Sequence, residues 1–243
     1  MSFENITAVI FDTYGTVVDW RASVIAEGRA LGERKGSSLG VPGGVDWEAF
    51  TDAWKATYRP YMDQVINGER PWTTNDALHP QRLGEIVEEF GITGLNEQDL
   101  GDFNRAWHRL KPWPDSIPGL NRIKAKVPIG AFSNGNLLLL ANMANHSDIP
   151  WDFIISSDLF RRYKPEPEFY LGAIDLLGGE ADRLMLVAAH NYDLANARKH
   201  GMKTAFVCRP TMFGPQQDTN LEAEDDWDIV TDSIEGVADA MGV

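Results

Sequence analysis

Side chains that can act in catalysis stand directly after several short apolar runs of this chain. The residues that follow the first three such runs are, in chain order, Asp12, Ser133, Asn134, His190 and Asp193. Carboxylates and imidazoles can attack carbon or move protons, and serine or asparagine side chains can bind an anion. Each of these residues is therefore a candidate for a site at the end of a strand.

A lysine between the second and third runs adds to this set. Lys164 precedes a Pro-Glu-Pro turn, and Tyr170 follows it within a helical pattern. A lysine at such a place can point back toward the strand ends. Taken singly, Asp12 and Asp193 could be turn or helix caps, and Lys164 could be a solvated surface residue. Their common position near strand ends favours one shared site.

The apolar runs themselves predict the class of fold. Short continuous runs at 8–11, 127–132, 184–189 and 203–208, with a weaker one at 153–156, are typical of strands buried on both faces. Helical patterns separate these runs, and this alternation predicts an α/β fold with a doubly wound parallel sheet. Ligands of such sheets bind beyond the carboxyl ends of the strands.

Residues 20–110 follow a different pattern. Four segments there have helical spacing without a good strand candidate, and linkers such as 37–44 are rich in Gly, Ser and Pro. We expect an α/β core domain made of residues 1–19 and 111–243. Residues 20–110 would form an inserted, all-helical cap domain over the sheet.

Composition excludes some kinds of partner. The formal net charge is −14 and the sequence pI is about 4.7, so we expect binding to neither nucleic acid nor membrane. Cys208 is the single cysteine, which excludes internal disulfides and indicates a reducing compartment. The sequence has no signal-peptide pattern and no apolar run of membrane-spanning length, and we expect a cytoplasmic protein.

With these motifs the chain resembles the haloacid dehalogenase (HAD) superfamily, and within it the type II, L-2-haloacid dehalogenases. The four superfamily motifs occur in order as FDTYGT, FSNGN, YKPEPEFY and VAAHNYDLANA, with Asp12, Ser133, Lys164 and Asp193. The resemblance spans nearly the whole chain and implies a Rossmann-like core with a helical cap. It also implies a hydrolase of carbon–halide bonds that needs no metal or other cofactor.

Phosphatases of the same superfamily are the main alternative. They need Mg²⁺ and a general acid, which in those enzymes is an Asp two residues after the nucleophile. That position is Tyr14 here, and a further acidic position of the fourth motif is Ala189. Both differences favour a dehalogenase, because a leaving halide needs no proton. A phosphatase with altered acid chemistry and a catalytically inert binding protein remain the alternatives.

The resemblance implies a role for each site residue. Asp12 would attack C2 of a haloacetate or an (S)-2-haloacid, and water would hydrolyse the resulting ester to a 2-hydroxy acid. Lys164 would keep Asp12 ionised, and Asp193 would hold Lys164 or position the water. Residues expected at the substrate are Tyr14, Thr16, Ser133, Asn134 and Tyr170, and Thr16 would also hydrogen-bond within the Asp12 loop.

Two places differ from the usual family pattern. In the fourth motif Ala188 and His190 replace a serine and an asparagine. His190 could be a general base near neutral pH, or it could only donate a hydrogen bond in place of the asparagine. In the cap, Lys55 stands where the family has the arginine that receives the halide. Arg59 lies four residues further on and shares its expected helix face, and we slightly favour Arg59 because a guanidinium is less strongly hydrated.

Four aromatic residues of the cap, Trp54, Tyr58, Tyr61 and Trp72, are expected mainly in its core, although one or two could line a halogen pocket. The expected small-molecule partners are a haloacid and its halide. The sequence leaves open which halide is released, fluoride included, and whether the chain forms a homodimer.

Overall fold

The computed structural model describes residues 3–243. Six parallel strands form one sheet in the order β5-β4-β1-β6-β7-β8. In that order the strands are Phe153–Ser156, Ile129–Ser133, Ala8–Phe11, Leu184–Ala188, Lys203–Val207 and Ile229–Thr231. The predicted doubly wound α/β fold is confirmed. The chain runs outward from β1 in both directions, so the ends of β1, β4 and β6 border one crevice.

Five of these strands coincide with the predicted apolar runs, and β8 was not predicted. Its three residues, IVT, lie between Asp228 and Asp232 at the edge of the sheet, and Ile229 alone of the three is buried. So short a segment between two acidic residues gives no hydrophobic signal of a strand.

Successive side chains of β1 point to opposite faces of the sheet, as the pleat requires. Val9 and Phe11 belong to one hydrophobic core, and Ala8 and Ile10 belong to the other. The first face is covered by α6 (Ser116–Lys124), α7 (Leu137–His146) and α11 (Ile234–Met241). The second face is covered by α9 (Pro167–Leu176) and α10 (Asn191–Lys199). Two short helices, α8 (Ser157–Phe160) and η3 (Ala181–Arg183), precede α9 and β6.

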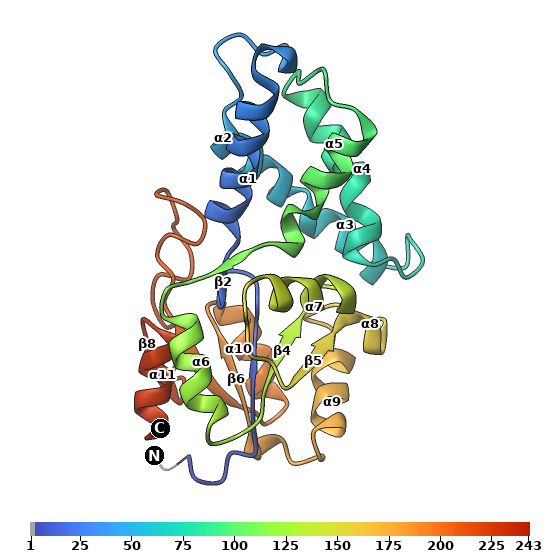
Figure 1. The fold of residues 1–243 in the computed structure, drawn as a ribbon. Helices are drawn as coiled ribbons and strands as arrows, with labels where there is room; N and C mark the ends of the chain where they lie inside the picture. Colours follow the sequence, from blue (N-terminus) through green and yellow to red (C-terminus); the bar gives the residue numbers. More distant parts are fainter. Residues whose placement is uncertain (1–2) are drawn as a thin grey trace.

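The helices between residues 19 and 111 gather beyond the carboxyl ends of the strands (Figure 1). They are α1 (Trp20–Lys35), η1 (Gly36–Leu39), α2 (Trp47–Ala56), α3 (Tyr58–Ile66), α4 (Asn75–Glu89), α5 (Glu97–Asn104) and η2 (Arg105–His108). We refer to these helices and their linkers as the cap. Two short antiparallel strands, β2 (Val18–Asp19) and β3 (Lys111–Pro112), connect the cap to the sheet. We propose that the boundary between core and cap lies at this pair.

The long helix expected around Trp54 is interrupted. α2 ends at Ala56, and α3 begins at Tyr58. Pro60 has no backbone N–H, so the carbonyl of Ala56 loses the partner that a continuous helix would give it. Among the described residues, no helix is long and apolar enough to cross a membrane.

Candidate active site

Asp12 follows β1 at the centre of the crevice and is buried. Its Oδ1 accepts a hydrogen bond from Nζ of Lys164 at 2.9 Å. Its Oδ2 accepts one from the hydroxyl of Thr16 at 2.7 Å and lies 3.0 Å from Nδ1 of His190. Since a carboxylate can only accept, Nδ1 of His190 carries the hydrogen of this contact. The fold thus brings three predicted site residues, Thr16, Lys164 and His190, to the carboxylate of a fourth.

The charges of this group follow from its contacts. Burial alone would raise the pKa of Asp12, but the positive charge of Lys164 and the hydrogen bond from His190 lower it well below its ordinary value. Burial alone would lower the pKa of Lys164, and the charges of Asp12 and Asp193 instead raise it above its ordinary value. Asp12 is therefore an anion, and Lys164 a cation, at ordinary pH.

Lys164 is fixed by three acceptors. Besides Asp12, its Nζ donates to Oδ2 of Asp193 at 2.5 Å and to the carbonyl of Phe132 at 3.0 Å. These three hydrogen bonds use all three protons of the ammonium group. Tyr170, which we expected at the substrate, lies behind this group: it is fully buried and donates to Oδ1 of Asp193 at 2.6 Å. The structure therefore places Tyr170 in the support of Lys164 and not in the pocket.

Ser133 ends β4, and Asn134 follows it. The hydroxyl oxygen of Ser133 accepts a hydrogen bond from the backbone N–H of Gly135 at 3.2 Å, which leaves the hydroxyl proton free to donate. The side chain of Asn134 is engaged with the backbone of Lys164, accepting from its N–H at 2.6 Å and donating to its carbonyl at 3.3 Å. Asn134 thus positions Lys164, and it also lines the cavity over Asp12, so its expected contact with substrate stays a prediction.

Thr16 faces the nucleophile and not the pocket. Its hydroxyl donates to Asp12 and accepts a hydrogen bond from the backbone N–H of Ala189 at 2.9 Å. Its carbonyl accepts from Nε of Arg209, whose guanidinium also binds both oxygens of Asp115, at 2.7 and 2.8 Å. This chain of contacts holds the turn after β1.

A small cavity of about 70 Å³ opens over Asp12. It is lined by Asp12, Tyr14, Trp20, Lys55, Tyr58, Ser133, Asn134, Lys164, His190, Tyr192 and Phe213. Three of these were not predicted: Trp20 begins α1, Tyr192 stands inside the fourth motif, and Phe213 lies in the loop after β7. Tyr192 could have been found from its motif, whereas nothing in the sequence around Phe213 indicates a pocket.

The cap supplies one cation to this cavity, and it is Lys55. Burial, then the nearby charge of Arg82, lower the pKa of Lys55 to about 8, although Asp12 acts in the opposite direction. Arg59, which we slightly favoured, does not line the cavity: it is largely exposed and binds Asp63 at 2.7 Å. The helix break before Tyr58 accounts for the difference, because Lys55 and Arg59 no longer belong to one helix.

One of the four cap aromatic residues, Tyr58, lines the cavity. Trp54 is buried in the cap, Tyr61 donates to Glu85 at 2.5 Å, and Trp72 packs on Tyr163. Sequence reasoning also missed Arg82, a buried cation whose guanidinium lies 4.9 Å from the ring centre of Tyr58.

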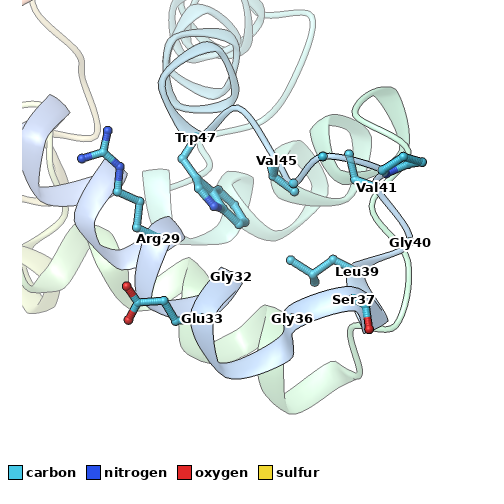
Figure 2. A pocket seen from close by; sticks show the side chains of 13 residues that line it. Arg29, Gly32, Glu33, Gly36, Ser37, Leu39, Gly40, Val41, Val45 and Trp47 are labelled. Carbon is cyan, nitrogen blue, oxygen red and sulfur yellow. The ribbon is translucent and has the colours of Figure 1, made fainter.

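A larger cavity, of about 790 Å³, lies within the cap, between the end of α1, η1 and Trp47 (Figure 2). The Gly-rich loop at 40–44 forms part of its wall, and no predicted site residue lines it. Its charged residues include Arg29, which is paired with Glu48. Although this cavity is the larger of the two, it contains none of the residues expected to act in catalysis, and we do not assign the catalytic pocket to it. Within residues 3–243, no three His, Cys, Asp or Glu side chains are grouped so as to hold a metal ion.

A family model of haloacid dehalogenase-like hydrolases matches residues 6–201. The chain therefore belongs to the haloacid dehalogenase-like hydrolases. The (S)-2-haloacid dehalogenase H-109 of Pseudomonas putida is 27% identical over 215 residues, which cover 85% of this chain and 87% of that protein. Haloacetate dehalogenase H-2 of a Moraxella species is 25% identical over 212 residues, with coverages of 85% and 87%.

Two crystal structures narrow the family further. One is an L-2-haloacid dehalogenase and the other a defluorinating L-2-haloacid dehalogenase, and each is 42% identical with a TM-score of 0.92. The similarity covers 98% of this chain in both cases, and 99% and 96% of the two other chains. The resemblance to 2-haloacid dehalogenases, hydrolases that act on carbon–halide bonds, is thereby confirmed.

Proposed function

We propose that the protein hydrolyses short 2-haloacids to 2-hydroxy acids and halide through an ester formed on Asp12. The expected substrates are haloacetates and (S)-2-haloacids. The observation that carries this proposal is the pair of opposite charges facing one small cavity, the Asp12 carboxylate below and the Lys55 ammonium on the cap side. A nucleophile and a cation for the leaving anion are what displacement of halide from carbon requires.

In the first step, an oxygen of Asp12 bonds to C2 while the C2–halogen electron pair leaves with the halide. Oδ1 accepts one hydrogen bond and Oδ2 accepts two, so Oδ1 keeps the more available lone pair. We assign the attack to Oδ1. The free hydroxyl proton of Ser133 is available to the substrate carboxylate, and Lys55 is available to the halide.

In the second step, water attacks Cγ of Asp12 and the Cγ–Oδ1 bond breaks. The 2-hydroxy acid leaves with Oδ1 and one proton of the water, and the second proton is released to solvent as the Asp12 carboxylate is restored. Oδ2 is the carbonyl oxygen of the ester, and negative charge develops on it. The donors already at Oδ2, the Thr16 hydroxyl and Nδ1 of His190, are placed to stabilise that charge. This geometry favours the hydrogen-bonding role of His190 over the base role.

The contacts of Asp12 also support a mechanism without a metal. Both of its oxygens have protein donors, and the ammonium of Lys164 lies between it and Asp193. A cation thus already balances the two carboxylates. Tyr14 occupies the position of the general acid of the phosphatases. Burial raises the pKa of Tyr14, so its phenol is a weak acid.

The size of the cavity favours substrates of two or three carbons, because a volume of about 70 Å³ leaves little room for a longer chain. The names of the relatives support the (S) configuration, since several are (S)-2-haloacid dehalogenases. A homodimer and a cytoplasmic location stay predictions.

The test is halide release from chloro- and bromoacetate and from both enantiomers of 2-chloropropionate, with and without EDTA. We expect release from the acetates and the (S) enantiomer, unchanged by EDTA. A single turnover in H₂¹⁸O should place one ¹⁸O atom in the peptide that contains Asp12. Absence of halide release from every substrate would refute the dehalogenase, and Mg²⁺-dependent turnover of p-nitrophenyl phosphate would favour the phosphatase.

A further inference from the structure

Tyr58 has an orientation that its neighbours fix. It begins α3 in the cap and lines the same cavity as Asp12. Its hydroxyl oxygen lies 2.7 Å from Nδ2 of Asn75, a fully buried residue at the start of α4. The direction of this hydrogen bond decides whether the Tyr58 proton is used in the protein or remains available to a ligand.

The second contact of Asn75 settles that direction. Nδ2 of Asn75 also lies 2.7 Å from the backbone carbonyl of Asn134. A carbonyl can only accept, so the amide group must face it with its NH₂ end, and exchanging the two ends of the amide would set two acceptors against each other. Both hydrogens of the NH₂ group are then donated, one to Asn134 and one to Tyr58. The oxygen of Tyr58 is therefore an acceptor toward Asn75.

The proton of the Tyr58 hydroxyl is left without an acceptor among the described residues, since Asn75 is the hydrogen-bond partner that this hydroxyl has there. The proton is firmly held, because burial raises the pKa of Tyr58 to about 12. An unused O–H group of a half-buried tyrosine at the wall of a cavity is a site for a hydrogen-bond acceptor.

Two cations determine the charge of that acceptor. Nζ of Lys55 lies 4.1 Å from the ring centre of Tyr58, and the guanidinium carbon of Arg82 lies 4.9 Å from it. Arg82 is buried, has no carboxylate partner within ion-pair distance in the described chain, and donates to the carbonyl of Tyr58 at 3.3 Å. Two cations around one phenol favour an anion at its hydroxyl and strengthen the O–H as a donor.

We propose that Tyr58 donates a hydrogen bond to the leaving halogen and thereby selects for the carbon–fluorine bond, with Asn75 as its positioning residue. The proposal rests on the function proposed above. The C2–fluorine bond breaks as the bond from Asp12 to C2 forms, and fluoride leaves with the electron pair; Tyr58 keeps its proton. Fluoride is the poorest leaving group of the halides and their strongest hydrogen-bond acceptor. A fixed donor therefore lowers the barrier more for fluoride than for bromide.

The experiment compares Tyr58→Phe with Tyr61→Phe, a matched variant. Both lose one hydroxyl from α3, but Tyr61 binds Glu85 and does not line the cavity. Release of fluoride, chloride and bromide from the three haloacetates is measured for each variant. Loss of one preorganised donor typically costs about 10²-fold or more, so we expect kcat/KM of Tyr58→Phe for fluoroacetate to fall by about that factor. For bromoacetate the decrease should be only a few-fold.

The ratio of fluoroacetate to bromoacetate activity is the deciding readout, because partial misfolding would lower both rates together. This ratio should fall in Tyr58→Phe and stay unchanged in Tyr61→Phe. An unchanged ratio in Tyr58→Phe, or wild-type protein that releases bromide but no fluoride, would overturn the proposal and leave the dehalogenase standing. Wild-type protein that releases no halide at all would refute the proposed function itself.

Discussion

The hydroxyl of Tyr170 lies 2.6 Å from Oδ1 of Asp193, on the carboxylate whose other oxygen binds Lys164. Burial raises the pKa of Asp193, while the charge of Lys164 and the hydrogen bond from Tyr170 oppose that rise. Asp193 must be ionised to hold Lys164, so activity should decrease as the pH falls through its pKa.

Replacing Tyr170 by Phe removes one of the contacts that oppose the rise. The pKa of Asp193 then increases further, and the acid limb of the pH profile of kcat/KM shifts to higher pH. Activity on the plateau should stay within a few-fold of wild type. An acid limb at the same pH in Tyr170→Phe would show that Asp193 does not control it.

The pKa of Lys55 leads us to expect that kcat/KM decreases at alkaline pH. Its pKa is about 8, because burial and Arg82 disfavour the ammonium form. If this cation receives the halide, kcat/KM should decrease as the pH rises through about 8. Lys55→Arg should remove this limb, since a guanidinium stays charged. A limb that persists in Lys55→Arg would belong to another group.

The same group affects stability, with a sign that follows from linkage. The pKa of Lys55 is lower in the folded protein than its ordinary value of 10.5, so charging it destabilises the folded state, fully below about pH 8. We expect Lys55→Met to raise the melting temperature at pH 7 and to lose this advantage as the pH approaches 10.5. Melting curves across that range provide the test, and a constant difference would contradict the assignment.

His190 can be tested by two substitutions that separate its alternative roles. Its Nδ1 contacts Asp12 at 3.0 Å, and an asparagine can restore a hydrogen bond there but cannot take a proton from water. If His190 acts as a donor, His190→Asn should keep activity within about tenfold, whereas His190→Ala should lose about 10²-fold or more. Equal losses in both variants would support the general base.

The largely buried pair of Arg209 and Asp115 should stabilise the fold and the turn after β1. Breaking a buried ion pair from one side typically costs about 3–5 kcal/mol, so we expect a decrease of that order in the free energy of unfolding of Asp115→Asn. The matched control is Asp239→Asn, which breaks a more exposed pair with Arg122 and should cost at most about 1 kcal/mol. Urea unfolding measures both, and equal losses would contradict this account.

Much of the site could be predicted because its residues follow strands. Asp12, Ser133 and Asp193 stand where strands of a parallel sheet end, and topology alone brings such positions together. The distant Lys164 was found from its motif, and in the structure its ammonium contacts both carboxylates.

The cap side was harder to predict, because helical faces depend on where helices break. The helix break between Ala56 and Tyr58 puts Lys55 and Arg59 on different helices, and Arg82 enters the site region from a third helix, α4. Side chains such as Phe213 reach the pocket from a loop with no periodic pattern, so neither spacing nor residue type marks them.

The pairing of Val18–Asp19 with Lys111–Pro112 places the two ends of the cap side by side. Because both ends of the cap lie at one place, the cap affects the folding of the sheet as a single closed loop would. Loop-closure entropy grows only slowly with loop length, and a pinned pair of ends limits it further. We therefore expect that a short hairpin grafted between these strands would leave the sheet able to fold, and that caps of other shapes could be exchanged at the same point.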